Sequence, residues 1–333
     1  MRTPLLHQAF PELRSTLPHL ALGTAPTPVR PLPGLTDGEA SVWLKDDGEF
    51  GDGGWGGNKV RKLEWLLADA KRRERRTILT VGGLGTNWGL ATALYGRELG
   101  LSTVLALVDQ PVDEHVRAQL RRLRRSGARL HFTRTKARTI AAAPLLLGRY
   151  SRGGRPPYLL PAGGSSPVGT LGYVEAAFEI GAQVRAGELP EPSHIVVAMG
   201  SGGTAAGLLL GFELLGLTTR VVGVVVNDTL RLDAVTITRL AARTRKLLAR
   251  RGAILPAPQQ NPGRLRIVND WLGRSYGHTT PEGERALRLA ETNENLDLEP
   301  VYTAKALAAL LAMNHRGEFG PGPVLYLNTN GPR

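Results

Sequence analysis

Short apolar segments alternate along the chain with longer amphipathic segments, and this alternation restricts the fold more than any other feature. Strands are expected at residues 41–45, 77–81, 102–108, 128–132, 194–199, 220–226 and 323–328. Helical periodicity covers residues 59–75, 87–99, 113–126, 167–186, 203–216, 230–251, 281–292 and 303–315. Strand–helix–strand units place strands in parallel and cover both faces of a sheet. The sequence therefore predicts the α/β class.

Two glycine-rich stretches divide the chain, GDGGWGGN at 51–58 and PAGGSSPVGTLG at 161–172. Such stretches are natural crossing points between lobes. We expect a smaller α/β lobe at residues 60–165, inserted into a larger lobe made of residues 1–59 and 166–333. The functional site is expected in the cleft between them.

Composition argues against several classes of protein. The formal net charge of +13 would suit a nucleic-acid partner. However, Leu120, Leu123 and Leu130 keep one side of the arginine-rich LRRLRRSGARL apolar, which indicates that the arginines lie on a solvated helix face. This segment contains no aromatic residue for base stacking, and no nucleic-acid recognition motif accompanies it. Cysteine is absent, which excludes disulfides and thiolate metal sites, and no other metal site is expected. No apolar run approaches the roughly 20 residues of a membrane helix, so we expect a cytoplasmic protein with neither a membrane nor a nucleic-acid partner.

A lysine follows the first glycine-rich stretch at the start of a predicted helix. Asn58 and Lys59 would lie in its first turn. The positive potential of a helix N-terminus, together with partial burial, disfavours an ammonium group and lowers its pKa. Lys59 is therefore a candidate amine nucleophile, with an ordinary surface lysine as the alternative. Arg61 and Lys62 have no glycine stretch directly before them and are expected at the surface.

The segment AMGSGGTAAG follows a predicted strand and opens a helix, an arrangement that suits a phosphate held by backbone N–H groups. The residues available to hold it are Gly200, Ser201, Gly202, Gly203 and Thr204. A simple tight turn is one alternative. The same letters fit the GxGxxA pattern, and Asp228 follows the next strand, so a Rossmann-type NAD(P) oxidoreductase also stays open.

Two more loops join a strand to a helix or one lobe to the other. In TVGGLGTNWGLATA the helix is expected to begin at Thr86 or Asn87, as a cap or as a receptor for a substrate carboxylate or cofactor oxygen. In PAGGSSPVGTLG, Gly164 would allow close backbone approach and Ser165 would cap the next helix, or the loop would serve only as a linker.

The C-terminal part holds the last candidates. Tyr302 precedes an alanine-rich helix, where an isolated tyrosine is usually core. The final strand ends in Asn328, Thr329, Asn330 and Gly331. Polar residues beyond the carboxyl edge of a parallel strand commonly face a cleft.

Together these segments resemble the pyridoxal-phosphate enzymes related to 1-aminocyclopropane-1-carboxylate deaminase and D-cysteine desulfhydrase. The resemblance covers most of the chain and runs in family order through GGNKVRKLE, the GGLGTNW stretch, PAGGSSPVGTLGYVEAA, GSGGTAAG, EPVYTAKAL and NTNG. It implies the tryptophan-synthase-β-like fold, called fold type II, with pyridoxal 5′-phosphate bound by the larger lobe. It also implies a homodimer and a small amino-acid substrate.

The resemblance also implies roles for single residues. Lys59 would bind the cofactor as an imine, and the segment from Gly200 to Thr204 would hold its phosphate. Asn87 would hydrogen-bond the ring hydroxyl, Tyr302 would stack on the ring or close over it, and Thr329 would meet the pyridine nitrogen. A hydroxyl at that nitrogen moderates the electron sink, which suits prompt loss of a β-substituent.

The substrate side of the site departs from the family pattern. Where the family usually reads QSNH, this chain has Gly85, Thr86, Asn87 and Trp88. Thr86 keeps a hydroxyl with an added methyl group, and Trp88 replaces a proton carrier with apolar bulk. Gly164 and Ser165 complete the expected substrate contacts.

The expected reaction is β-elimination or ring opening of a small amino acid to a 2-oxo acid and ammonia, with Lys59, Thr86 and Tyr302 nearest the chemistry. A β-replacement synthase, another or larger substrate, and a non-catalytic cofactor-binding regulator stay open as alternatives.

Overall fold

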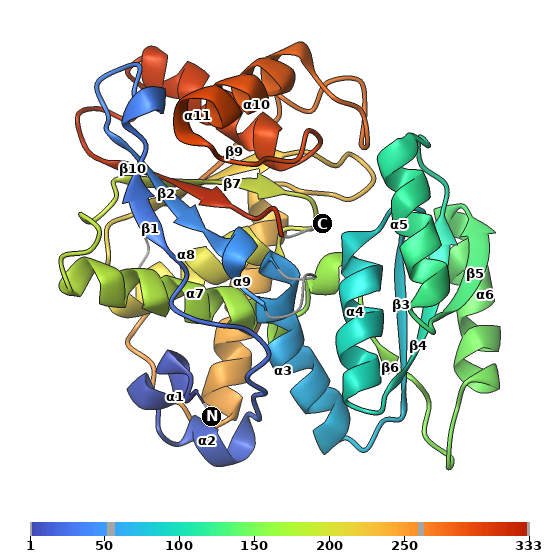
Figure 1. Cartoon of the computed structure of the whole chain (residues 1–333). Helices are drawn as coiled ribbons and strands as arrows, with labels where there is room; N and C mark the ends of the chain where they lie inside the picture. The colour runs from blue at the N-terminus through green and yellow to red at the C-terminus, as the bar shows by residue number, and fades with distance from the viewer. Residues whose placement is uncertain (1, 52–56, 259–262, 332–333) are drawn as a thin grey trace.

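The computed structural model describes residues 2–51, 57–258 and 263–331, which form two separate β-sheets (Figure 1). In spatial order the larger sheet contains β1 (Val29–Pro31), β2 (Val42–Asp46), β10 (Val324–Asn328), β7 (His194–Met199), β8 (Arg220–Val225) and β9 (Leu265–Val268). Its strands are parallel except for β1, which runs antiparallel to β2. The smaller sheet contains β5 (Arg129–Arg134), β4 (Ser102–Val108), β3 (Thr77–Gly83) and β6 (Tyr158–Leu159), all parallel. The predicted α/β class is confirmed.

Helices cover both faces of the larger sheet, because successive side chains of a strand point to opposite faces. On β7, Ile195 and Val197 belong to the core on one face and Val196 to the core on the other. The first face carries α7 (Pro167–Arg185), α8 (Gly203–Leu215), α9 (Ala234–Arg250) and the short α1 (Leu5–Ala9) and α2 (Leu13–Thr16). The second face carries α10 (Pro281–Glu294), α11 (Thr303–His315) and the 3₁₀ turn η1 (Pro33–Leu35).

The smaller sheet has its own layers. Helices α4 (Asn87–Glu98) and α5 (Glu114–Arg125) pack on one face, and α6 (Lys136–Arg149) packs on the other. Helix α3 (Asn58–Arg72) contacts both α7 and α4 and so joins the two halves. The short turns η2 (Asp47–Glu49) and η3 (Ala162–Gly164) lie on connections between the halves. The division at residues 60 and 165 stays a prediction.

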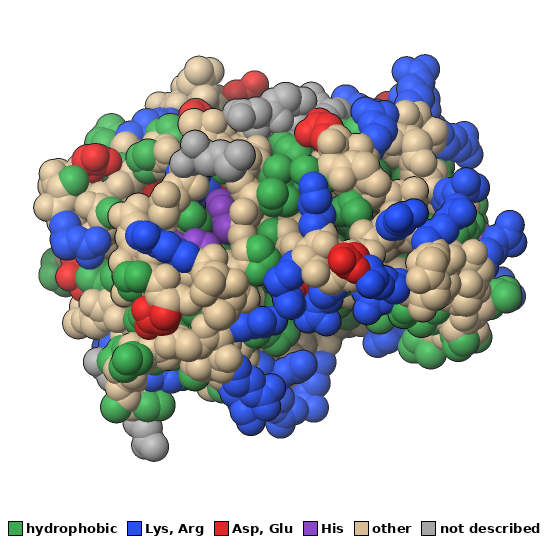
Figure 2. Space-filling view, turned by 90° about the horizontal axis from the view of Figure 1, so that it is seen from below, with side chains coloured by type: hydrophobic (Ala, Val, Ile, Leu, Met, Phe, Trp, Pro, Cys, Tyr) green, Lys and Arg blue, Asp and Glu red, His purple; other side chains and the backbone are tan. Residues whose placement is uncertain are grey.

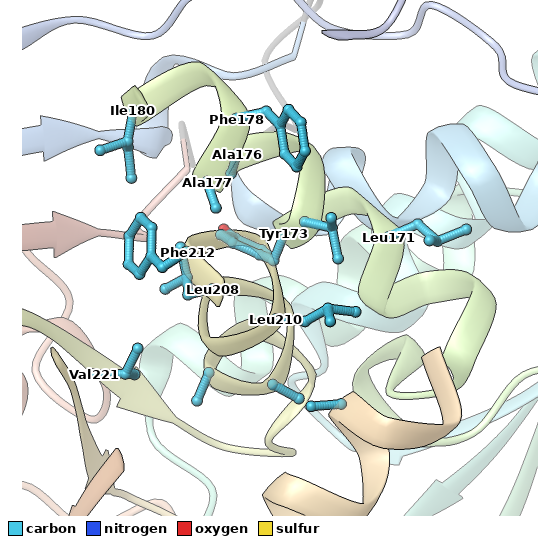
Figure 3. Close-up of a cluster of buried hydrophobic side chains, with 14 of the residues drawn as sticks. Leu171, Tyr173, Ala176, Ala177, Phe178, Ile180, Leu208, Leu210, Phe212 and Val221 are labelled. Carbon is cyan, nitrogen blue, oxygen red and sulfur yellow. The ribbon is translucent and has the colours of Figure 1, made fainter. Parts of the chain in front are cut away.

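Close packing between α7 and α8 fixes the direction in which α8 points its N-terminus (Figure 3). Small residues allow this approach: a Cβ atom on Gly207 would lie 2.5 Å from the Cβ of Tyr173, and one on Gly211 would lie 2.3 Å from that of Ala177. Phe212 fills the same buried cluster. Since overpacking a core costs about 1–3 kcal/mol, both glycines are needed for this contact.

The surface is strongly basic. Figure 2 shows Lys and Arg side chains over the face seen from below, and they are densest towards the end that carries the smaller sheet. On α5, Leu123 is buried while Arg117 and Arg121 are exposed and pair with Glu114, which confirms the expected solvated helix face. Within the described ranges, no helix has both the length and the apolar character needed to cross a membrane.

Candidate active site

A cavity of about 550 Å³ opens between the carboxyl ends of the two parallel sheets. It brings together most of the side chains that the sequence selected from distant segments. The predicted site residues on its wall are Lys59, Thr86, Asn87, Trp88, Gly200, Ser201, Gly202, Thr204, Tyr302 and Thr329. Gly164, Ser165 and Gly203 do not line the cavity but lie directly behind it, as described below.

Lys59 lies in the first turn of α3, as the sequence predicted. Its Nζ donates a hydrogen bond to Asn58 Oδ1 at 2.7 Å. Burial lowers the pKa of Lys59 to about 8. The helix begins after Gly57, which has a φ of 65° and lies so close to Gly331 that a Cβ atom would come within 2.8 Å of it. The rest of the preceding glycine-rich stretch, residues 52–56, lies outside the described residues.

Lys62 was expected at the surface, and this prediction was wrong. Its side chain is only 2% exposed, and Nζ donates to the carbonyl oxygen of Gly163 at 3.0 Å. Burial, followed by the positive charge of Lys59, lowers the pKa of Lys62 to about 7. Its Nζ lies 3.1 Å from where a Cβ of Gly203 would be. The site thus contains a second amine near the glycine loop, and the i, i+3 spacing of the two lysines could have indicated a shared helix face.

Arg61 is also buried, contrary to the sequence prediction, and is 1% exposed. Its guanidinium donates to Asp47 through Nε at 2.9 Å and to Glu179 through Nη1 at 3.0 Å. Lys45 donates to the same Glu179 carboxylate. Two cations and two carboxylates therefore neutralise one another beneath the first turns of α3. The partners lie far from Arg61 in the sequence, so no local pattern could have indicated them.

The predicted phosphate loop joins β7 to α8. Gly202 precedes the helix in a left-handed conformation with a φ of 82°. A Cβ on Gly200 would lie 2.7 Å from the ring of Tyr302, so the loop backbone runs directly along the cavity wall. Its N–H groups lie at the positive end of a 13-residue helix, which favours an anion.

Ser165 supports this loop from behind. Its Oγ donates to Ser201 Oγ at 2.8 Å and accepts from the Gly203 amide at 3.0 Å. The Gly203 amide is therefore engaged within the protein, and its contact with a phosphate stays a prediction, as does a substrate contact for Ser165. The expectation that Ser165 caps the next helix was wrong, because Ser166 caps α7 by accepting from Gly169 N.

The stretch from Thr86 to Trp88 opens α4 at the cavity wall. Thr86 is the N-cap, as expected, and its Oγ1 accepts from Gly89 N at 3.1 Å. Asn87 Oδ1 accepts a hydrogen bond from the side chain of Gln119. Trp88 is 3% exposed, and its Nε1 donates to Thr80 Oγ1 at 2.8 Å. Trp88 is thus mainly a packed wall of the smaller lobe.

Gly164 lies against that wall. A Cβ atom on Gly164 would come within 2.6 Å of the Trp88 ring. The predicted close backbone approach at Gly164 is therefore confirmed, with the indole as the neighbour. Substrate contacts for Trp88 and Gly164 stay predictions.

Two tyrosines face each other on the larger-lobe side. The hydroxyl oxygens of Tyr302 and Tyr276 are 2.6 Å apart, and their rings meet edge to face with centroids 6.0 Å apart. Burial raises the pKa of both phenols, so both are neutral at physiological pH. Tyr276 was not selected from the sequence, since it sits in a loop without a motif.

Thr329 follows β10 at the same end of the cavity. The neighbouring Asn328 donates to Asp46 Oδ1 at 2.9 Å and accepts from Asn330 N at 3.1 Å. These bonds hold the backbone on both sides of Thr329. Burial raises the pKa of Asp46 to about 6.

The residues present fit pyridoxal phosphate. The glycine loop at a helix N-terminus suits the phosphate, and an amine with a lowered pKa lies on the same wall. Gly200 and the Tyr302 ring line the same cavity, and a Cβ on Gly200 would clash with that ring at 2.7 Å, so only glycine allows this approach. Fold and site together define an α/β protein in which a glycine loop suited to an anion and a buried lysine amine share one cavity wall.

Comparison with known proteins agrees. Residues 20–330 match the model of the family described as pyridoxal-phosphate dependent enzyme, and the chain belongs to this family. It is 34% identical over 330 residues to a putative 1-aminocyclopropane-1-carboxylate deaminase of Pyrococcus furiosus, covering 98% of this chain and 95% of that one. It is also 34% identical over 322 residues to the D-cysteine desulfhydrase of Klebsiella pneumoniae, covering 94% of each chain.

Solved structures agree as well. A crystal structure described as an ACC deaminase homologue has a TM-score of 0.80 and 32% identity, covering 99% of this chain and 95% of that one. The structure of threonine deaminase isoform 2 from Solanum lycopersicum has a TM-score of 0.66 and 15% identity, covering 99% of this chain and 85% of that one. At this identity it supports the fold alone. The expected fold type II architecture and pyridoxal phosphate cofactor are confirmed. The nicotinamide alternative was wrong, and Asp228 instead accepts from Tyr276 N at 3.1 Å.

Proposed function

We propose that the protein is a lyase that deaminates a small amino acid to a 2-oxo acid and ammonia, with Lys59 as the cofactor-binding lysine. The observation that carries this proposal is the position of the Lys59 amine on the same cavity wall as the glycine loop. Burial lowers the pKa of this amine to about 8. A lowered pKa keeps a larger share of this amine unprotonated and nucleophilic near neutral pH.

The chain offers a residue for each of the cofactor contacts that the proposal requires. The loop from Gly200 to Thr204 would hold its phosphate through backbone N–H groups, with the Lys62 amine close behind the loop. Thr329 would meet the pyridine nitrogen, and Tyr302 would cover one face of the ring. When bound, the cofactor supplies an electron sink for the substrate's amino nitrogen.

Chain residues perform the proton transfers and the orientation of the substrate. The Lys59 amine would serve as the general base that accepts a proton from the substrate carbon and returns it later. Thr86 Oγ1 already accepts from Gly89 N, so its hydrogen is available to donate to the substrate carboxylate. The hydroxyl groups of Tyr302 and Tyr276 are hydrogen-bonded to each other. A phenol that gives its proton to a leaving group can therefore take a proton from the other phenol.

The names of the relatives suggest D-cysteine and 1-aminocyclopropane-1-carboxylate as the first substrates to test. Loss of the β-sulfur substituent, which leaves as hydrogen sulfide, and opening of the ring each end, after addition of one water, in a 2-oxo acid and ammonia. A β-replacement reaction would instead require a second nucleophile and would release no ammonia.

The lysine assignment can be tested by borohydride reduction of the yellow protein, followed by peptide mass mapping. The expected label lies on Lys59 in the wild type and in Lys62→Met, and disappears in Lys59→Ala. Lys62 is the matched alternative, since it is a buried amine on the same helix face. A label on Lys62 in the wild type would refute the assignment.

We also propose that the enzyme is cytoplasmic and that it is a homodimer, the latter as the family resemblance implies. Light scattering of the purified protein should then give twice the chain mass of 35.8 kDa. A mass of one chain at micromolar concentration would refute the dimer.

A further inference from the structure

Helix α5 carries one polar side chain that does not belong to its solvated face. Gln119 is 1% exposed on a helix whose other polar residues are mostly arginines at the surface. Both ends of its amide are engaged. Nε2 donates to Asn87 Oδ1, and Oε1 accepts from Arg122 Nη1 at 3.0 Å.

Arg122, Gln119 and Asn87 form a chain of two hydrogen bonds, called the relay below, in which each donor and acceptor is fixed. A guanidinium can donate but cannot accept, so Arg122 must face the oxygen end of Gln119. The nitrogen end of Gln119 therefore faces Asn87, which must turn its own oxygen towards it. The Asn87 Nδ2 group is left for the cavity, because Asn87 lies on the cavity wall and is exposed.

We propose that Arg122, acting through Gln119, is a positioning residue that fixes Asn87 as a hydrogen-bond donor to a cofactor oxygen. The direction of the relay determines which kind of atom Asn87 can bind: a hydrogen-bond acceptor, such as the hydroxyl oxygen attached to the cofactor ring. A bound group that presented a donor here would leave two N–H groups facing each other. This inference rests on the proposed contact between Asn87 and the cofactor.

The relay also gives a role to part of the arginine cluster on α5. Arg122 is half-buried, whereas Arg124, on the same helix, is exposed. Both arginines carry the same charge, but only Arg122 donates to the Gln119 side chain. Arg124→Gln removes the same charge without touching the relay and is the matched control.

Gln119→Glu tests the direction of the relay. The carboxylate still accepts from Arg122 but cannot donate to Asn87, so the Asn87 amide must turn and present its oxygen to the cavity. Asn87→Asp removes the donor directly. Both variants should weaken binding of pyridoxal phosphate to the apoprotein about tenfold or more, which corresponds to about 1.4 kcal/mol. The absorbance maximum of the bound cofactor should shift in both.

The two effects should not add in the double variant, because both remove the same donor. Arg124→Gln should stay within about twofold of wild type. If Asn87→Asp weakens binding and Gln119→Glu behaves like Arg124→Gln, the relay is refuted while the Asn87 contact stands. If Asn87→Asp itself binds the cofactor like wild type, the Asn87 contact fails and the relay with it. Thermal unfolding of each apoprotein separates these results from a general loss of folding.

Discussion

Replacing Arg61 by methionine tests whether the charge network beneath α3 holds the site in place. The change removes one cation from a buried group in which Arg61 and Lys45 balance Asp47 and Glu179. Breaking a buried ion pair by removing one partner costs about 3–5 kcal/mol, because a carboxylate is left without compensation. We expect a loss of this size in urea unfolding of the apoprotein at pH 7, followed by circular dichroism.

The matched control is Lys71→Met, which removes a cation from an exposed position on the same helix. Surface changes of this kind usually stay within about 0.5 kcal/mol. Equal losses in Arg61→Met and Lys71→Met would refute the reasoning, since burial would then have no bearing on the cost.

The pH dependence of Arg61→Met gives a second reading. Burial by itself would raise the pKa of Glu179, but the charges of Arg61 and Lys45 outweigh it and hold the pKa well below the usual range. Such a carboxyl stabilises the fold above its unfolded pKa of about 4.3, and this stability is lost as the pH falls towards the folded pKa. Without Arg61, Glu179 should bind its proton at a higher pH, so acid unfolding should begin at a higher pH than in the wild type.

Three further predictions concern the cavity and its surroundings. Gly200→Ala should weaken pyridoxal phosphate binding about tenfold in apoprotein titrations, because the new Cβ would meet the Tyr302 ring at 2.7 Å, whereas Gly148→Ala on an open helix surface should not. Thr86→Val should lose about 1 kcal/mol of unfolding free energy together with most turnover, and Thr86→Ser should keep both, because serine retains the cap and the hydroxyl. Burial raises the pKa of Asp46 in the folded state to about 6, so the free energy of unfolding should fall as the pH rises from about 4 to 6. Asp46→Asn should remove this fall from a stability profile measured over that range.

The sequence predicted the regular elements well where periodicity was strong. The strands at 102–108 and 194–199 and the helix at 303–315 have the predicted bounds. The missed strands β1, β6 and β9 have only two to four residues, too few to show a period. Helix α6 was missed as well; it contains Pro144, a residue that normally argues against a helix interior.

The site was predicted less evenly, for a physical reason. Glycine loops and helix caps are local, so the segments around Lys59, Thr86 and Gly200 could be selected from their own letters. The burial of Arg61 depends on Glu179, which lies 118 residues away along the chain, and no local pattern contains that information. The same limit applied to Tyr276, whose position follows only from its contact with Tyr302.

The charge network also bears on the protonation of the Lys59 amine. Asp47 and Glu179 are the carboxylates buried under the first turns of α3, and both are bound by Arg61. Burial lowers the pKa of Lys59, and no carboxylate within the described ranges contributes to that shift. A carboxylate left unpaired nearby would favour the ammonium form and raise that pKa. Pairing Asp47 and Glu179 with Arg61 and Lys45 therefore does more than stabilise the helix, because it keeps these two carboxylates from acting as partners of the amine two residues away from Arg61.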